Sequence, residues 1–227
     1  MEVTVAKQSG FCKGVELAVN TALNLEEKNV YVLGEIIHNA DVVKLLEDKG
    51  LTTVENLSLV PDGATVIFRS HGVPKEYYSI CANRSIKVID CTCSFVKRTQ
   101  AIVEEQSAQG KFIVIVGEPE HPEVVGLLGW CGGNATVVND FNKVPCELES
   151  KDLCIVCQTT FSAEKFEKII KNIRKLCKKT VAVFQDDLLY YYKKAARDGT
   201  TCKKVRGYAC CGWFKQQQHQ QVVRISF

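Results

Sequence analysis

The side chains best suited to chemistry in this chain follow short apolar runs. Cys12, His38, His71, Cys93 and His121 each stand in a glycine-rich or polar stretch just after such a run. Imidazoles and backbone N–H groups are well suited to binding phosphate or diphosphate, and thiolates bind metals. We therefore predict a polar, anion-binding pocket with thiols among the residues around it.

A carboxylate and a hydroxyl extend this set. Glu123 lies two residues beyond His121 in a proline-bounded loop, where a carboxylate can deliver protons; the alternative is a loop carboxylate exposed to solvent. Thr159 lies in the QTT stretch that follows the apolar run 153–156.

The chain has twelve cysteines, and most of them have a simpler interpretation. In a chain without a secretory signal, many cysteines indicate reduced core thiols together with a metal or redox site. Cys154 and Cys157 (CIVC) resemble a redox pair, but they lie inside an apolar run, so we expect core thiols. Cys91 and Cys93 point the same way if the CTC stretch is extended, so their side-chain direction does not distinguish them.

The elements that must hold these residues alternate between strands and helices. Short β-branched runs predict buried strands at residues 3–6, 30–33, 64–68, 86–89, 112–116, 153–156 and 180–184. Helical patterns lie between several of them, at residues 15–27, 41–49, 95–109 and 163–177, the last with Ser162 as a plausible N-cap. This alternation predicts an α/β fold of parallel sheets covered by helices, in two similar units that divide near residues 93–96. Ligands bind at the carboxyl ends of such strands, so the polar loops are expected to converge.

Composition excludes several classes of protein. An apolar fraction of 46% over 227 residues is enough to bury a core, yet no run of about 18 apolar residues exists to span a bilayer. The start, MEVTVAKQSG, is unlike a secretory signal, so we expect a cytoplasmic location and no membrane partner. Residues 185–227 carry eight Lys/Arg against three Asp, a net of +5, while the rest of the chain is −2. Because this basic tail has no repeated basic motif, we expect no nucleic-acid partner.

Six motifs together resemble one family. GFCKGV, GEIIHN, SHGV, DCTCSFV, HPEVVG and CQTT occur in this order and resemble the LytB family of 4-hydroxy-3-methylbut-2-enyl diphosphate reductases. The likeness covers residues 1–184. It implies three α/β units around a central site, of which this chain supplies two, residues 1–93 and 94–184. It also implies the last step of the non-mevalonate isoprenoid pathway, in which the allylic hydroxyl leaves as water and isopentenyl and dimethylallyl diphosphate form.

The resemblance also implies residue roles. Cys12 and Cys93 would be two of three thiolates that hold a [4Fe–4S] cluster, and Cys91 has no cluster role. The remaining site residues would act on the substrate: His38, His71 and His121 would bind the diphosphate, Glu123 would supply the proton, and Thr159 would contact the substrate near Glu123. The family further implies a ferredoxin- or flavodoxin-type electron donor.

The tail lacks two features that the resemblance implies, a third cysteine in a stretch like TICYTT and an Asn-Ser-Ser-Asn loop. Lys codons are AA(A/G) and Gln codons CA(A/G), so a Lys-Gln or Gln-Gln junction shifted by one base encodes only Asn or Ser. In that register residues 215–222 fit NSSNTNK, and residues 186–192 permit TICYTT. We therefore predict a one-base frameshift near Gln185, with residues 185–227 forming an out-of-frame, disordered tail.

The frameshift leads to an expectation for the chain itself. Without the third thiolate and the third unit, we expect no measurable reductase activity, little iron, and aggregation of exposed apolar faces. The alternative is a non-catalytic α/β protein that binds metal or diphosphate, with Cys202, Cys210 or Cys211 as the third ligand.

Overall fold

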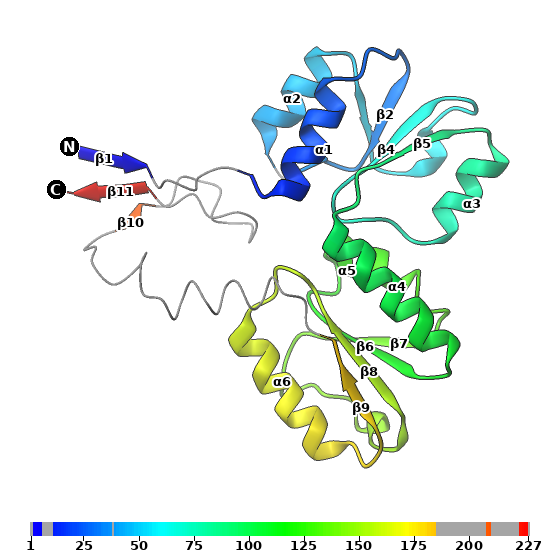
Figure 1. Ribbon diagram of the computed structural model, residues 1–227, viewed down its shortest axis with the longest axis vertical. Coiled ribbons are helices and arrows are strands. Elements are labelled where there is room, and N and C mark those ends of the chain that lie inside the picture. The colour runs from blue at the N-terminus through cyan, green and yellow to red at the C-terminus, as the bar shows by residue number, and fades with distance from the viewer. Residues whose placement is uncertain (1, 6–10, 38, 185–207, 210–222, 227) are drawn as a thin grey trace.

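The fold is described from a computed structural model, which covers residues 2–5, 11–37, 39–184, 208–209 and 223–226 (Figure 1). Side chains are described for residues 11–37 and 39–184. Two four-stranded parallel sheets, each covered by helices, make up most of this part of the chain. The predicted α/β class with parallel sheets is therefore confirmed.

The first unit has a sheet of strand order β3-β2-β4-β5. Its elements are, in chain order, α1 (Lys13–Leu23), β2 (Val30–Leu33), α2 (Ala40–Asp48), β3 (Thr52–Val54), a 3₁₀ turn (Leu57–Leu59), β4 (Thr65–Phe68), α3 (Glu76–Asn83) and β5 (Lys87–Asp90). Buried residues of α1 and α2 form one core with one face of the sheet, and the 3₁₀ turn and α3 form another core with the opposite face. All residues of β4 are buried, as expected for a strand that is covered on both faces.

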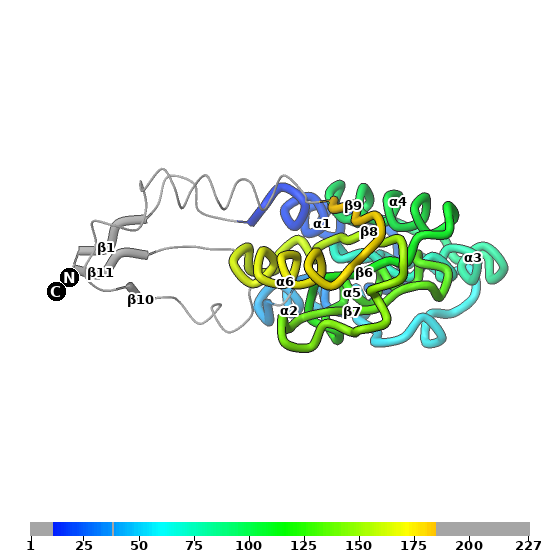
Figure 2. The backbone as a smooth tube through the Cα atoms, turned by 90° about the horizontal axis from the view of Figure 1, so that it is seen from below, coloured from blue at the N-terminus to red at the C-terminus, as the bar shows by residue number. Residues whose placement is uncertain are grey.

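The second unit repeats this plan, with strand order β7-β6-β8-β9. Its elements are α4 (Ser94–Ala108), β6 (Phe112–Val116), α5 (Pro122–Leu128), β7 (Ala135–Val138), a 3₁₀ turn (Cys146–Ser150), β8 (Leu153–Cys157), α6 (Ala163–Leu176) and β9 (Val181–Val183). The helices α4 and α5 share one core with the sheet and α6 shares the other, so that β6 and β8 lie between α4 and α6 (Figure 2). Helix α4 thus packs on the second sheet, although it follows directly from the last strand of the first.

The sequence of α6 shows why this helix forms where it does. Phe166, Ile169, Ile170 and Ile173 are buried at helical spacing against the sheet. The hydroxyl of Ser162 accepts a hydrogen bond from the backbone N–H of Lys165 at 3.4 Å, so the predicted N-cap is confirmed.

The sequence patterns did not predict three short elements. The edge strands β3 and β7 have only three and four residues, too few to show the two-residue alternation of a strand. Helix α3 has a single buried side chain, that of Cys81, so its sequence does not show the apolar spacing of a helix. In the described part of the chain, no helix has both the length and the apolar character of a membrane span.

The first strand differs from its expected place. β1 (Glu2–Val5) does not join the parallel sheet of the first unit but pairs antiparallel with β11 (Val223–Ser226), which also pairs with β10 (Tyr208–Ala209). Two short stretches of the expected tail thus pair as strands, and the disordered tail as a whole stays a prediction. The reason for this pairing is visible in VRIS, where β-branched and polar residues alternate with the period of a strand. The rest of the expected tail lies outside the described residues.

Candidate functional site

The two cysteines of the predicted metal site occupy equivalent places in the two units. Cys12 is the N-cap of α1 and Cys93 is the N-cap of α4, the helices that open the first and second units. The start of α1 lies against the Cys93 thiol, since a Cβ on Gly14 would lie 2.9 Å from Cys93 Sγ. The absence of a side chain at Gly14 therefore lets the start of α1 approach the Cys93 thiol, and Cys12 is near enough to influence the pKa of that thiol.

The surroundings of Cys93 shift the pKa of its thiol in opposite directions. Burial raises the pKa of the Cys93 thiol, and the backbone N–H groups of Phe95 and Val96 act to lower it. The negative charges of the neighbouring Cys12 and Glu123 raise the pKa further. A bound cation would reverse this balance, because it stabilises thiolates.

The structure separates Cys91 from Cys93. Cys91 is 6% exposed and packs in the core of the first unit with α1. Burial raises the pKa of its thiol, and a hydrogen bond with Thr21 of α1 acts to lower it. Cys91 therefore lies among core residues, whereas Cys93 lies at the start of α4 beside Gly14.

Two of the three predicted histidines meet, one from each unit. His71 is buried in the loop after β4, and His121 is the N-cap of α5. Their ring centroids are 5.4 Å apart with the ring planes at 90°. The Nδ1 atom of His121 accepts a hydrogen bond from the backbone N–H of Glu123 at 3.2 Å. The third predicted histidine, His38, lies outside the described residues.

Glu123 is a buried helical residue rather than an exposed loop residue. Pro122 is at the first position of α5, where its missing N–H costs nothing, and Glu123 follows in the first turn with 1% exposure. The N–H of Thr159 donates to Glu123 Oε1 at 2.7 Å, and the Thr159 hydroxyl donates to Oε2 at 2.7 Å. The alternative of a solvent-exposed carboxylate is therefore wrong, because both oxygens are held in the protein by one residue.

A residue that the sequence did not single out connects the loops of the second unit. Gln158 is 1% exposed; its Oε1 accepts from the N–H of Glu118 and its Nε2 donates to Thr160 Oγ1, both at 2.9 Å. The N–H of His121 in turn donates to the carbonyl of Glu118 at 3.0 Å. Gln158 thus ties the loop that carries His121 to the loop that carries Thr159.

An internal repeat in the sequence could have revealed this arrangement. GEIIH at residues 34–38 and GEPEH at residues 117–121 have the same spacing and follow equivalent strands, β2 and β6. At each glycine there is no room for a side chain. A Cβ would lie 2.4 Å from the Arg69 guanidinium at Gly34, and 2.9 Å from Gln158 at Gly117. The repeat aligns His38 with His121 in the sequence.

The remaining candidate cysteines belong to cores. Cys154 and Cys157 are buried on opposite faces of β8, one in the core with α4 and α5 and the other in the core with α6. Burial raises the pKa of Cys154 to about 11. The prediction of core thiols is confirmed, because two cysteines on opposite faces of a sheet do not form a redox pair.

Within the described ranges, no group of three or more Cys, His, Asp or Glu side chains is arranged to hold a metal ion. The role of Cys12 and Cys93 as metal ligands therefore stays a prediction. Cys202, Cys210 and Cys211, the alternative third ligands, lie outside the described residues.

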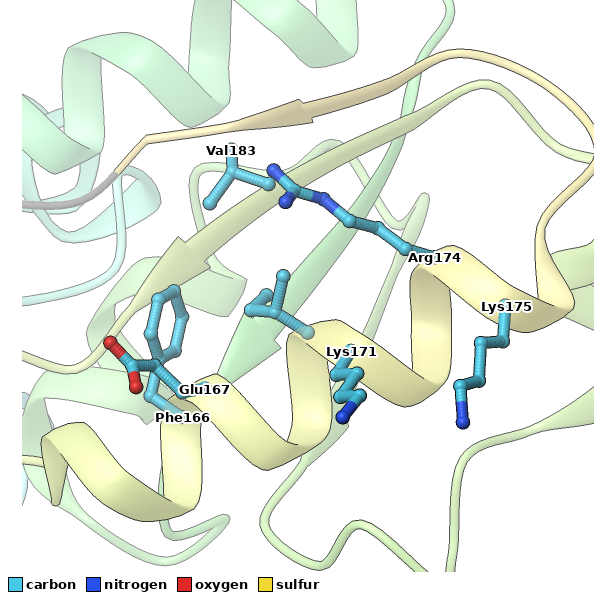
Figure 3. A pocket seen from close by; sticks show the side chains of 7 residues that line it. Phe166, Glu167, Lys171, Arg174, Lys175 and Val183 are labelled. Carbon is cyan, nitrogen blue, oxygen red and sulfur yellow. The ribbon is translucent and has the colours of Figure 1, made fainter.

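A groove on the second unit lies apart from these residues. It runs between α6 and β9 and has a basic rim (Figure 3). Its lining consists of Phe166, Glu167, Ile170, Lys171, Arg174, Lys175 and Val183. None of the predicted site residues lines it, so it is not the predicted pocket.

Comparisons with known proteins agree with the motifs. A family model described as "LytB protein" matches residues 3–202. This match extends past residue 184, the predicted end of the resemblance. A 4-hydroxy-3-methylbut-2-enyl diphosphate reductase from Alkaliphilus oremlandii is 43% identical over 180 residues, 76% of this chain and 63% of the relative. One from Clostridioides difficile is 37% identical over 178 residues, 76% of this chain and 64% of the relative. The chain thus spans a little under two thirds of the length of these relatives.

Solved structures show the same relationship. A structure of (E)-4-hydroxy-3-methyl-but-2-enyl diphosphate reductase, the terminal enzyme of the non-mevalonate pathway, matches with a TM-score of 0.71 and 34% identity, over 85% of this chain and 71% of that one. The reductase from Plasmodium falciparum matches with a TM-score of 0.70 and 28% identity, over 78% of this chain and 57% of that one. On the family match, the sequence identities and the shared fold, the chain belongs to the LytB protein family.

Proposed function

We propose that this chain carries the substrate-binding and proton-donating residues for reduction of 4-hydroxy-3-methylbut-2-enyl diphosphate, the activity for which its relatives are named. The observation that carries the proposal is the buried Glu123–Thr159 pair, close enough to Cys93 for Glu123 to influence its thiol. A buried carboxyl held by two hydrogen bonds is a positioned acid, and a neighbouring thiol pair suits a redox metal centre.

The diphosphate would lie against the histidine pair. His71 and His121 come from different units and their rings pack edge to face. Because Nδ1 of His121 accepts the N–H of Glu123, the Nε2–H of this ring would be the group that donates to a phosphate oxygen. By the internal repeat, His38 would complete this side of the pocket.

Glu123 would supply a proton through Thr159. When Glu123 is protonated, its hydroxyl can donate to Thr159 Oγ1, and the Thr159 hydroxyl is then available to the substrate. The reaction consumes two electrons and two protons: the allylic C–O bond breaks, the oxygen leaves as water, and a new C–H bond forms. Burial of Glu123 keeps this acid away from bulk water.

Cys12 and Cys93 would hold two corners of a [4Fe–4S] cluster. Thiolates are the usual ligands of such clusters, and Gly14 leaves room for the Cys93 thiol beside the start of α1, where Cys12 is the N-cap. When bound, the cluster would supply electrons from a ferredoxin- or flavodoxin-type donor, and an iron without a protein ligand would act as a Lewis acid. We place this oxygen-sensitive chemistry in the cytoplasm, where thiols stay reduced.

The second function is the alternative that the sequence leaves open, a non-catalytic protein that binds metal or diphosphate. The cysteines that would complete its metal site, Cys202, Cys210 and Cys211, lie outside the described residues.

Anaerobic reconstitution with iron and sulfide distinguishes the two functions. In the protein with its reading frame restored near Gln185, about four irons per chain with the broad visible absorbance of a cluster would support the reductase proposal. A single bound zinc without iron would support the binding protein and overturn the cluster assignment.

A further inference from the structure

The histidine pair exists only because the two units meet closely. The loop that carries His71 continues through Gly72, Val73 and Pro74, and this segment lies against α5 and the turn after it. His121 begins α5. The contact between this loop and α5 therefore sets the position of one histidine relative to the other.

Glycines on α5 allow the contact. A Cβ on Gly126 would lie 3.3 Å from the carbonyl oxygen of Gly72. A Cβ on Gly129 would lie 2.5 Å from Pro74 Cβ and 2.7 Å from Pro74 Cα, distances at which something must move. Gly129 has a φ of −67°, so its backbone would accept alanine and only the contact with Pro74 requires glycine.

Trp130 fixes the same loop by a hydrogen bond and by its ring. Its indole N–H donates to the carbonyl oxygen of Val73 at 2.9 Å. Its ring meets Tyr78 edge to face, with centroids 6.0 Å apart, and the Lys75 ammonium lies 5.9 Å from the ring centroid. Lys75 also pairs with Glu104 of α4, so cross-unit contacts surround Trp130.

We propose that Trp130 and Gly129 are positioning residues that hold the His71 loop against α5, so that His71 and His121 can bind one diphosphate together. The proposal rests on the diphosphate-binding function proposed above. Trp130 and Gly129 act through their contacts with Val73 and Pro74, which lie two and three residues beyond His71.

Binding of inorganic pyrophosphate tests the consequence. We would measure it by anaerobic titration calorimetry on the monomeric fraction of the 227-residue chain. Trp130→Phe keeps an aromatic ring but loses the hydrogen bond, and Gly129→Ala adds only the clashing methyl. For each we expect the Kd to rise about tenfold, as for the loss of one good hydrogen bond. Leu128→Ala is the matched control, since Leu128 is exposed on the same helix, and its Kd should stay within about twofold.

A double variant separates positioning from general loosening. If Trp130 acts through His71, then Trp130→Phe should cause no further loss in a His71→Ala background. An additive loss in that background, or a Kd for Trp130→Phe equal to that of the parent, would overturn the proposal.

Hydrogen exchange provides a readout that needs no ligand. In Trp130→Phe, peptides covering residues 70–75 should exchange faster by about tenfold, while those covering β6 and β8 stay protected. Unchanged exchange at residues 70–75 would also overturn the proposal. If the parent binds no pyrophosphate at all, the diphosphate function fails, and exchange alone decides whether Trp130 holds the loop.

Discussion

At the scale of single residues, burial distinguishes Glu123 from the neighbouring carboxylates as the candidate proton donor. Of the carboxylates near the predicted pocket, Glu118 and Glu120 are half-buried or exposed, whereas both oxygens of Glu123 are held by Thr159. A carboxyl in that position keeps one orientation, which a proton donor requires.

We predict that Glu123→Gln keeps the fold, because an amide of the same shape can still accept from the Thr159 N–H. Turnover by a reconstituted, frame-restored protein should fall about 10²–10⁴-fold, the usual loss when an acid is removed. Single-turnover kinetics with equal cluster content measure this. Near-normal turnover would remove Glu123 from the mechanism.

The cysteines give a second prediction at this scale. In a frame-restored protein, Cys12→Ser and Cys93→Ser should abolish cluster assembly, because each removes a thiolate at the start of a unit's opening helix. Cys91→Ser and Cys154→Ser are the controls, since both side chains are buried in cores. Iron content and visible absorbance report the result. Loss of iron in Cys91→Ser alone would reverse our choice between the neighbours.

At the scale of elements, the site depends on the loops that follow β6 and β8. Gln158 crosses between them and is the side chain that connects Glu118 to Thr160. Since Gln158 is almost fully buried, these hydrogen bonds have no water to replace them.

We therefore predict that Gln158→Met lowers the free energy of unfolding by about 1–3 kcal/mol, because it removes two hydrogen bonds and leaves the N–H of Glu118 without its acceptor. Urea denaturation measures the loss. Equal stability of Gln158→Met and the parent would show that the loops hold without this link.

Elements also show what the sequence could and could not predict. The central strands β4 and β8 are continuous apolar runs, and their burial on both faces made them visible. Helix α5 was missed because His121, Pro122 and Glu123 suggest a loop, while Pro122 in fact starts the helix. The approach of His71 to His121 was beyond prediction, because it depends on how Gly129 and Trp130 fit a loop of the other unit.

At the scale of the whole molecule, the chain spans a little under two thirds of the length of its curated relatives. The family model reaches residue 202, and β10 and β11 show that parts of the tail can pair as strands. Neither finding accounts for the Gln-rich stretch at residues 215–221, whereas the predicted one-base shift would.

We predict that restoring the frame by one base near the Gln185 codon brings back iron binding and reductase activity together, because the shifted register permits a third cysteine and fits an Asn/Ser loop. The comparison is between the two proteins purified anaerobically, with their masses confirmed. Robust turnover by the unrestored chain would contradict the functional conclusion drawn from the shift.

Cys12 and Cys93 stand at the same place in two repeated units, at the N-cap of each unit's opening helix. If both thiols bind the metal as proposed, each copy of the unit would offer one sulfur, and only docked copies would chelate the metal. A lone copy would be a monodentate ligand and would release the metal readily. Loading of the metal would then depend on assembly of the repeats, so that a chain whose repeats had not come together would stay without metal.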